Sequence, residues 1–279
     1  MKIFKLKEEL KSYLNSQEKD KIISFVPTMG ALHDGHLSLI LNAKQNSDLV
    51  ICSIFINPTQ FNNLKDLEKY PRTPNSDIKT LDNIKCDVVY MPETSDLYQK
   101  SEKLKQYQFN GLDSFMEGKG RPGHFNGVAT VIEKLFRIIQ PNKAYFGQKD
   151  LQQLQIIKYL SKQLNFKTEI IGVSTKREES GLAMSSRNKR LSNSDLDKAT
   201  LIYKTLMFIK ENAYKYSIKE LKATCIKKFN EEPEIDLEYL EIVSLDNLNP
   251  IDLYNHNGRN VACIAASISS VRLIDNIIF

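Results

Sequence analysis

Two of the four histidines in this 279-residue chain, His33 and His36, lie three residues apart in VPTMGALHDGHLSLI, residues 26–40. The segment predicts a strand that ends near Met29 and a helix that begins near Asp34. The first N–H groups of a helix lack intrahelical partners and attract anions. Two imidazoles placed there could donate to phosphate oxygens and to the charge that develops when pyrophosphate leaves. The alternative is a capped helix with two exposed histidines.

A second polar pair follows the next apolar run, in FINPTQF, residues 55–61. We expect Asn57 and Gln60 to be exposed at the tip of a strand. An amide donates and accepts hydrogen bonds together, which suits a hydroxy acid. A simple proline turn has the same sequence pattern, so this segment is a weak signal alone.

Two later segments carry cations that could contact phosphate. YFGQKDLQQLQ, residues 145–155, places Lys149 and Asp150 after a strand and Gln153 one turn into the following helix. A lysine beside a helix start is a natural phosphate contact, although a glycine turn with an aspartate N-cap has the same pattern. MSSRN, residues 184–188, supplies two hydroxyls and a guanidinium that could fold over phosphates.

Glycine and arginine are both sparse and unevenly placed. Glycine permits positive φ and close backbone approach to a ligand, so its clustering indicates where backbone meets substrate, although each stretch alone is an ordinary turn. A planar guanidinium suits phosphate and carboxylate better than a lysine does. Eight of the eleven glycines fall in a few short stretches, and four of the eight arginines lie in loop-like segments that contain Gly, Pro or Ser: Gly30, Gly35, Gly118, Gly120, Gly123, Gly127, Gly147 and Gly181, with Arg72, Arg121, Arg177 and Arg187.

The elements that must position these residues alternate between strand and helix. This alternation predicts an α/β fold, a Rossmann-like doubly wound parallel sheet with helices on both faces. Ligands of such sheets gather beyond the carboxyl ends of the strands. Strands are expected at residues 22–26, 49–56, 87–91, 143–147 and 167–174, and helices at 35–46, 66–85, 127–140 and 150–164. Residues 1–14 have apolar residues at helical spacing.

The alternation ends at the polar segment 175–192, which we interpret as a linker. Helical spacing then appears at residues 195–216 and 218–229, and strand-like runs at 237–243, 260–268 and 271–279. The pattern predicts a domain of residues 1–175 and a smaller α+β domain of residues 176–279.

Composition excludes several classes of protein. No apolar run approaches the roughly 18 to 20 residues that cross a bilayer, and residues 1–14 lack the features of a signal peptide, so we expect a cytoplasmic protein without a membrane partner. The net charge of +5 comes from lysines interleaved with acidic residues, which disfavours a nucleic-acid partner. The four cysteines are widely separated, so neither a zinc site nor a disulfide framework is expected, and Cys52 and Cys86 are interpreted as inert core residues.

The histidine pair after the first strand and the Ser/Arg loop after the last resemble the nucleotidyl-transfer superfamily that contains class I aminoacyl-tRNA synthetases. A closer resemblance is to the pantothenate synthetase (pantoate–β-alanine ligase) family. It rests on six segments between residues 27 and 188, in order: PTMGALHDGHLSLI, FINPTQF, DLEKYPRT, EGKGRPGHFNGVATVI, FGQKDLQQL and REESGLAMSSRN. Together these segments are highly specific, whereas the rest of residues 176–279, beyond REESGLAMSSRN, fits in length and pattern only.

The resemblance implies an enzyme that joins pantoate to β-alanine with ATP and Mg²⁺, through a pantoyl-adenylate, and releases pyrophosphate and AMP. It also implies a homodimer and a C-terminal lid. The implied catalytic residues are His36, the acid that assists pyrophosphate departure, its partner His33, Lys149 and Arg187. The implied ATP site is Met29, Gly30, Ala31, Leu32, His33, Asp34, Gly35, His36, Gly147, Gln148, Lys149, Asp150, Lys176, Met184, Ser185, Ser186 and Arg187. Gln60 and Gln153 would bind pantoate, Gln60 would also reach β-alanine, and Glu117 and Arg121 would flank the cavity.

Gln148 stands where the family more often has Glu, and the metal ligands are unknown, with Asp77 a weak candidate. A nucleotidylyltransferase could share the histidine loop, although the paired glutamines and the lack of a dense basic phosphate pocket disfavour it. An RNA-binding module would need aromatic platforms or a cationic face, and the sequence shows neither.

Overall fold

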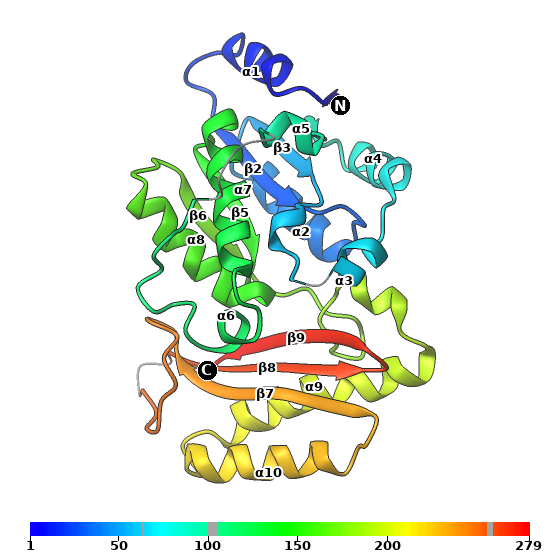
Figure 1. Cartoon of the computed structure of the whole chain (residues 1–279), viewed down its shortest axis with the longest axis vertical. Coiled ribbons are helices and arrows are strands. Elements are labelled where there is room, and N and C mark those ends of the chain that lie inside the picture. Colours follow the sequence, from blue (N-terminus) through cyan, green and yellow to red (C-terminus); the bar gives the residue numbers. More distant parts are fainter. Residues whose placement is uncertain (63, 100–104, 256–258) are drawn as a thin grey trace. The chain divides into compact units, whose positions relative to one another are not determined.

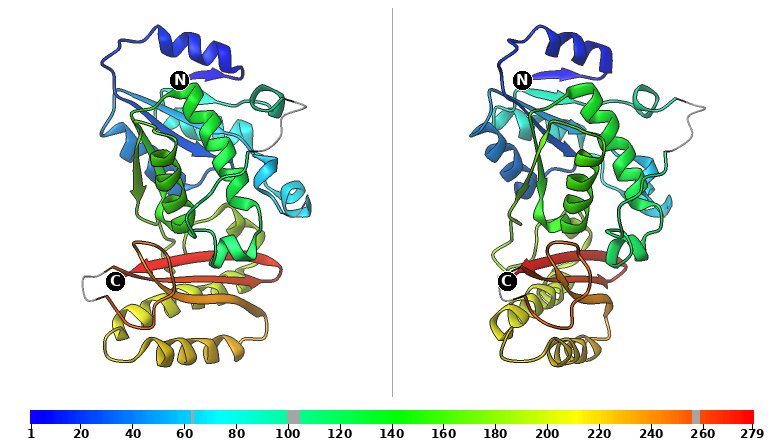
Figure 2. Two further views of the ribbon diagram at one scale, coloured as in Figure 1. Left: turned by 60° about the vertical axis from the view of Figure 1, so that its left-hand side comes forward. Right: turned by 90° about the vertical axis from the view of Figure 1, so that its left-hand side faces the viewer.

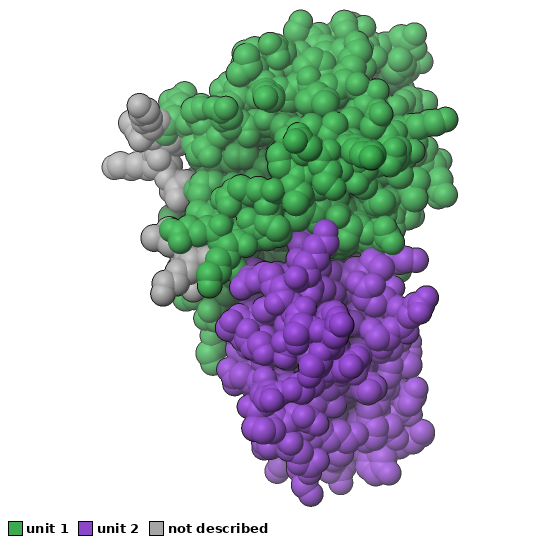
Figure 3. Space-filling model, turned by 90° about the vertical axis from the view of Figure 1, so that its right-hand side faces the viewer, with its two compact units in different colours: residues 1–113, 117–147, 152–174 green, residues 114–116, 148–151, 175–279 purple. Residues whose placement is uncertain are grey.

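The computed structural model describes residues 1–62, 64–99, 105–255 and 259–279. The chain divides into two compact units, which Figure 3 shows in different colours. The first unit contains residues 1–113, 117–147 and 152–174, and the second contains residues 114–116, 148–151 and 175–279.

The first unit is built on a six-stranded parallel sheet in the order β1-β4-β3-β2-β5-β6 (Figure 1). The strands are β1 (Lys2–Phe4), β2 (Ile23–Thr28), β3 (Leu49–Ile54), β4 (Val88–Tyr90), β5 (Lys143–Gly147) and β6 (Glu169–Val173). β2 pairs with β3 on one side and β5 on the other, so the strand order reverses beside it. The crevice at such a reversal is where doubly wound sheets bind ligands.

Both faces of this sheet are covered, because successive strand residues point to opposite sides. Phe25 packs with α7 (His124–Ile139) and α8 (Leu151–Gln163), whereas the next residue, Val26, packs with α2 (Asp34–Lys44). The ribbon views show helices on both sides of this sheet (Figure 2). Buried strands therefore have the near-continuous apolar runs seen in the sequence. The helices up to residue 163 are α1 (Lys7–Asn15), α2 (Asp34–Lys44), α3 (Leu64–Lys69), α4 (Pro74–Asn83), α5 (Thr94–Leu97), α6 (Met116–Gly120), α7 (His124–Ile139) and α8 (Leu151–Gln163), with 3₁₀ turns η1 (Pro58–Gln60) and η2 (Gln148–Asp150).

The second unit has a three-stranded antiparallel sheet, β7-β8-β9, packed against two helices. Both helices begin with a reciprocal capping box, Ser192 with Asp195 and Ser217 with Glu220. The elements are η3 (Ser186–Arg190), α9 (Asn193–Asn212), α10 (Ile218–Asn230), β7 (Ile235–Ser244), β8 (Asn260–Ile268) and β9 (Val271–Ile278). The structure thus confirms a parallel α/β sheet together with a smaller α+β unit.

Three local predictions were wrong. Residues 2–4 form strand β1 instead of helix, because pairing with β4 decides the conformation of so short a segment. The helix expected over residues 66–85 is two helices, α3 and α4, since prolines interrupt it at positions 71 and 74. The segment 175–192 is a folded part of the second unit and not a linker, as the bridge between Arg177 and Ala183 shows.

Candidate active site

The two motif histidines form the cap of α2. His33 is the N-cap, and its Nδ1 accepts a hydrogen bond from the Gly35 N–H at 3.1 Å. The His36 Nδ1 accepts from the His33 N–H at 3.3 Å, and the two rings lie 4.1 Å apart. Because each Nδ1 accepts a backbone N–H, the neutral ring carries its proton on Nε2. The cap therefore fixes both imidazoles as Nε2–H donors.

Asp77, from α4, fixes the turn that leads into these histidines. Its carboxylate accepts from the N–H of Ala31 at 3.0 Å and of Leu32 at 2.8 Å, and from the Thr73 hydroxyl at 3.2 Å. Ala31 has a φ of 51°, a left-handed conformation that side-chain-bearing residues rarely adopt. Asp77 is buried, and its oxygens are engaged in this turn. The suggestion that Asp77 is a metal ligand is therefore replaced by a positioning role.

A cavity of about 690 Å³ lies beside this turn, over the carboxyl ends of β2, β3 and β4. Its lining includes Met29, Ala31, Asp77, Arg72 and Thr94. Arg72 donates to the carbonyl oxygens of residues 67, 68 and 70, so it caps the end of α3. These backbone contacts differ from the phosphate contact that the sequence suggested for Arg72.

The expectation that Asn57 and Gln60 are exposed at the tip of a strand was wrong. Both side chains are buried, at 1% and 9% exposure respectively. The Asn57 Nδ2 donates to the Gly127 carbonyl at 3.0 Å and to the Gln60 Oε1 at 3.2 Å. The Tyr98 hydroxyl donates to the Asn57 Oδ1 at 2.8 Å. Helix α7 approaches η1 so closely at Gly127 that a Cβ there would overlap the Thr59 carbonyl. Tight packing against α7 therefore orients both amides.

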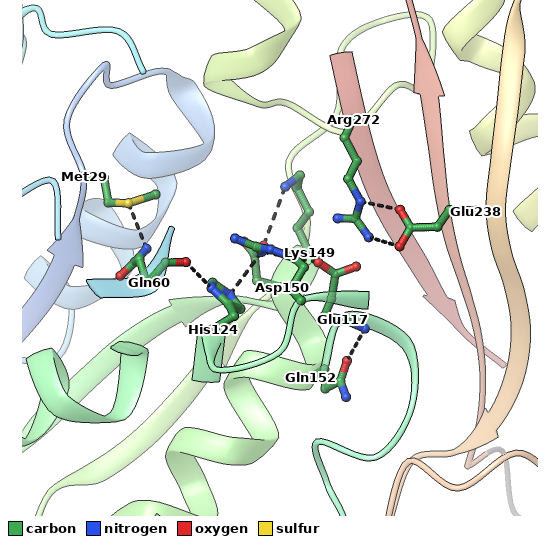
Figure 4. Close-up of polar contacts among 10 residues, drawn as sticks. Met29, Gln60, Glu117, His124, Lys149, Asp150, Gln152, Glu238 and Arg272 are labelled. Atoms are coloured by element: carbon green, nitrogen blue, oxygen red, sulfur yellow. Dashed lines mark hydrogen bonds and ion pairs between the residues drawn. The ribbon is translucent and has the colours of Figure 1, made fainter. Parts of the chain in front are cut away.

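The Gln60 side chain points its amide nitrogen at a weak partner. Its Nε2 lies 2.9 Å from the Met29 Sδ (Figure 4). A thioether is a poor acceptor. The Nε2 donors are thus better suited to an oxygen-bearing ligand than to the contact they make here.

His124, at the start of α7, holds the backbone of Gln60. Its Nδ1 lies 2.7 Å from the Gln60 carbonyl oxygen, and its Nε2 lies 3.1 Å from a guanidinium nitrogen of Arg121. A carbonyl only accepts and a guanidinium only donates, so the ring is neutral with its proton on Nδ1. Arg121 in turn pairs with Glu117 at 3.4 Å. This series of contacts joins α6 to the Gln60 turn, and Figure 4 labels Gln60, His124 and Glu117 within it.

The two neighbouring glutamines of α8 have different environments. Gln152 is buried, accepts from the Glu117 N–H at 3.0 Å and donates to the Leu112 carbonyl at 2.7 Å. Gln153, which the sequence singled out, is half-buried. Gln152 therefore anchors the start of α6, while Gln153 retains exposure that a ligand could use.

Of the remaining predicted residues, Gly147 ends β5 in the first unit, and the others belong to the second unit. Lys149 lies 3.8 Å from the Asp150 carboxylate and is one-fifth exposed. Lys176 is exposed, and Met184, Ser185 and Arg187 are half-buried around the start of η3. The Ser185 hydroxyl caps η3 by accepting from the Arg187 N–H. The Ser186 side chain is buried in the same turn.

The four cysteines are core residues. All four cysteines are free and buried, and burial raises the pKa of Cys86 and of Cys225 to about 11. In the part of the chain that the structure describes, no three His, Cys, Asp or Glu side chains gather as a metal site. None of the described helices is long and apolar enough to cross a membrane.

Comparison with known proteins gives the family. The model of the pantoate-beta-alanine ligase family matches residues 2–278. Pantothenate synthetase of Cytophaga hutchinsonii is 45% identical over 274 residues, which are 97% of this chain and 96% of that protein. The chain belongs to the pantoate-beta-alanine ligase family. The protein is therefore an enzyme, an ATP-dependent ligase.

Solved structures of the ligase family share the whole fold. The crystal structure of pantothenate synthetase from Thermus thermophilus has a TM-score of 0.93 and 36% identity, and covers 99% of each chain. The pantoate-beta-alanine ligase of Francisella tularensis, described as complexed with beta-gamma ATP and beta-alanine, has a TM-score of 0.84 and 38% identity, and covers 100% of this chain and 97% of its own. By sequence alone, the pantothenate synthetase of Flavobacterium psychrophilum is 43% identical, over 99% of this chain and 99% of that protein.

Sequence reasoning missed two positioning residues of this ligase. Asp77 and His124 each contact backbone groups of a motif segment, across 45 and 64 residues of chain respectively. His124 lies in a segment that carried the family resemblance, and Asp77 lies four residues beyond another, so both residues were visible but their partners were not. Only the folded structure shows which segments they join.

Proposed function

We propose that the protein condenses (R)-pantoate with β-alanine to give pantothenate, through a pantoyl-adenylate, and releases pyrophosphate and then AMP. Family membership and the ligands named for the Francisella tularensis relative support this proposal. The observation that carries it is the pair of Nε2–H donors at the start of α2, directly after a central strand of the sheet. That arrangement suits a transferring phosphoryl group.

In the first step, a pantoate carboxylate oxygen attacks the α-phosphorus of ATP. The bond from that phosphorus to the bridging oxygen breaks, and the electron pair leaves with pyrophosphate. His33 and His36 would donate Nε2–H hydrogen bonds to phosphate oxygens as this charge develops. Protonation at Nδ1 would break the cap, so we assign His36 as a neutral donor that assists pyrophosphate departure.

Other predicted ATP contacts come from each unit. In the first unit, the loop Met29–His36 would present its two histidine Nε2–H donors to the nucleotide, since the N–H groups of residues 30–33 and 35 are bonded within the turn. Gly147 ends β5 without a side chain. In the second unit, Lys149 and Arg187 would supply positive charge to phosphates, as the lysine and guanidinium chemistry permits. The other residues of the second unit that we assign to the ATP site are Gln148, Asp150, Lys176, Met184, Ser185 and Ser186. Gln148 replaces the commoner Glu without removing Lys149 or Asp150.

In the second step, the β-alanine amine attacks the acyl carbon of the adenylate. The bond from that carbon to the AMP oxygen breaks, AMP leaves with the electron pair, and the nitrogen loses a proton. Gln60 and Gln153 would hold pantoate, and Gln60 would also reach β-alanine. A substrate oxygen would replace the Met29 sulfur as the acceptor for Gln60 Nε2.

Mg²⁺ fits this scheme as part of the nucleotide. Mg²⁺ usually binds substrate phosphates and one or two carboxylates while it keeps several waters. The described residues offer no cluster of protein ligands, and Asp77 is engaged with backbone donors, which leaves Asp34 and Asp150 as the carboxylates among the proposed ATP contacts. Bound to the phosphates, Mg²⁺ would neutralise charge on the leaving pyrophosphate.

Isotope exchange between pyrophosphate and ATP tests the proposed function. We expect exchange that requires pantoate and does not require β-alanine, with AMP as the final product. ADP as the product, or exchange that depends on β-alanine, would contradict the two-step reaction. Exchange with no carboxylic acid present would favour a different nucleotidyl transfer.

The family resemblance also underlies our proposal of a cytoplasmic homodimer. Sedimentation equilibrium of the purified protein tests the dimer, because a mass near twice 32.1 kDa is expected at micromolar concentration. A mass that stays at the monomer value across the concentration range would contradict it.

A further inference from the structure

Asn276, on β9, holds the turn that contains Lys149. Its Nδ2 donates to the Gln148 carbonyl and to the Lys149 carbonyl, each at 2.9 Å. The side chain is buried at 3% exposure, so these two bonds are shielded from water. Both carbonyls can only accept, which fixes the orientation of the amide.

The preceding residue, Asp275, holds the other loop of the second unit. Its carboxylate accepts both guanidinium nitrogens of Arg177, at 2.5 and 3.1 Å. Arg177 also donates to the Gly181 carbonyl at 3.1 Å and stacks on the Tyr203 ring at 4.4 Å. Burial raises the pKa of Asp275, and the guanidinium opposes this by favouring the charged form. Arg177 therefore ties the segment between Lys176 and Met184 to β9.

Strand geometry explains why neighbouring residues hold different loops. Side chains alternate between the faces of a strand. Asp275 shares the face of Val271 and Leu273, which pack on the helices, and Asn276 lies on the opposite face. One dipeptide can thus contact a loop on each side of the sheet.

We propose that Asp275 and Asn276 are positioning residues that hold the 148–150 turn and the 176–187 loop in one fixed arrangement for ATP. The inference rests on the proposed function, since both loops carry residues assigned to ATP. The proposal requires no residue of the second unit outside these two loops to contact the nucleotide. The effect on substrate acts through Lys149, Lys176 and the Met184–Arg187 segment.

A matched pair of variants isolates the hydrogen bonds of Asn276. Thr and Val have the same shape and suit a strand, but only Thr can donate one hydrogen bond. We expect N276V to raise the KM for ATP about tenfold and N276T about threefold, with the KM for pantoate changed by less than about twofold. Calorimetry with the α,β-methylene analogue of ATP, which lacks the bond that the proposed reaction breaks, should give the same order of affinities.

Asn260 provides the control. It is also a buried asparagine of the same sheet, and its Nδ2 donates to the Asn255 carbonyl at 2.9 Å and the Tyr214 hydroxyl at 2.8 Å. N260V and N260T should lower the melting temperature without changing the KM for ATP. Equal effects of the 260 and 276 variants on ATP affinity would overturn the inference, as would N276V and N276T with the same affinity for the analogue.

Asp275→Asn independently tests the proposed role of Asp275 in holding the 176–187 loop. It keeps the shape but removes the charge that pairs with Arg177, and we expect the KM for ATP to rise about fivefold or more. An unchanged KM in a folded variant would remove Asp275 from the proposal. If the wild-type protein binds no ATP analogue, the proposed function is contradicted. If the wild type binds the analogue and N276V, N276T and D275N bind it with the same affinity, only the inference about Asp275 and Asn276 is contradicted.

Discussion

His33 and His36 stabilise the helix with the same atoms that fix their chemistry. Each Nδ1 accepts a backbone N–H at the start of α2, and that acceptance leaves Nε2 as the protonated nitrogen. The capped-helix and functional interpretations of the motif are therefore compatible. Removing either imidazole should affect both stability and catalysis, so a useful variant must separate the two effects.

We expect His36→Ala to lower kcat by about a hundredfold, roughly 3 kcal/mol of transition-state stabilisation, because a phosphate donor is lost. It should also lower the free energy of unfolding by about 1 kcal/mol through the lost cap. His36→Gln restores an acceptor at the third helical position and should recover the stability. Full activity in His36→Ala, measured by pyrophosphate exchange, would show that the imidazole is only a cap.

Asp77→Asn should damage the same turn from a distance. An amide replaces one oxygen with an NH₂ group, which would face the Ala31 or Leu32 N–H donor. We expect a loss of about 1 to 3 kcal/mol in unfolding free energy and about tenfold in kcat/KM for ATP. Thr73→Val removes only the hydroxyl donor to Asp77 and should have a smaller effect on both quantities. Equal effects of the two variants would contradict the proposed role of the backbone bonds.

At the scale of elements, the contact between α7 and η1 sets the position of Gln60. Gly127→Ala introduces a Cβ that overlaps the Thr59 carbonyl, so the two elements must separate. The better helix propensity of Ala, about 1 kcal/mol, offsets part of the resulting strain. We expect about a tenfold higher KM for pantoate, measured by exchange at saturating ATP. Gly172→Ala meets only the end of the Leu154 side chain and should leave this KM unchanged.

A buried carboxylate on α7 predicts a pH dependence of stability. Burial alone would raise the pKa of Glu133, but hydrogen bonds from Tyr107, Arg137 and Lys105 outweigh it and lower the pKa below its ordinary value of 4.5. A lowered folded-state pKa contributes stability above pH 4.5 that is lost as pH falls through the folded-state value. The melting-temperature difference between wild type and Glu133→Gln should therefore be largest near neutral pH and shrink in acid. A constant difference from about pH 7 to about pH 3 would contradict this account.

Elements with a strong local signal could be predicted from sequence, and elements decided by distant partners could not. The strands that end at Thr28, Ile54 and Gly147 are buried apolar runs bounded by turn residues, so their type follows from the sequence. β1 has three residues, and its conformation depends on β4, more than 80 positions away.

The same distinction applies to the site. The histidine pair could be found because both residues and the helix start lie within one short segment. The burial of Asn57, by contrast, depends on a carbonyl 70 residues away, and the role of Asn276 on carbonyls 127 and 128 residues away. Local composition carries no record of such partners, which is why 175–192 resembled a linker.

At the scale of the whole molecule, each compact unit has its own apolar core. One face of the first unit's sheet packs around residues such as Phe25, Phe136 and Ile157, all of which are buried. The second unit packs α9 and α10 on its antiparallel sheet around Leu206 and Ile264. Separate cores allow separate local stabilities, because opening one core need not expose the other.

We therefore expect Leu206→Ala to destabilise the second unit selectively. Leu206 is fully buried, so its truncation leaves a cavity and should lower unfolding free energy by about 2 to 5 kcal/mol. Amide hydrogen exchange in α9 and in β7 to β9 should accelerate by roughly thirtyfold or more, while β2, β3 and β5 keep their wild-type rates. Ile157→Ala, at an equally buried position in the first unit, should give the reciprocal pattern. Equal acceleration in both units, in either variant, would show that the chain unfolds as one cooperative body and that neither core is independent.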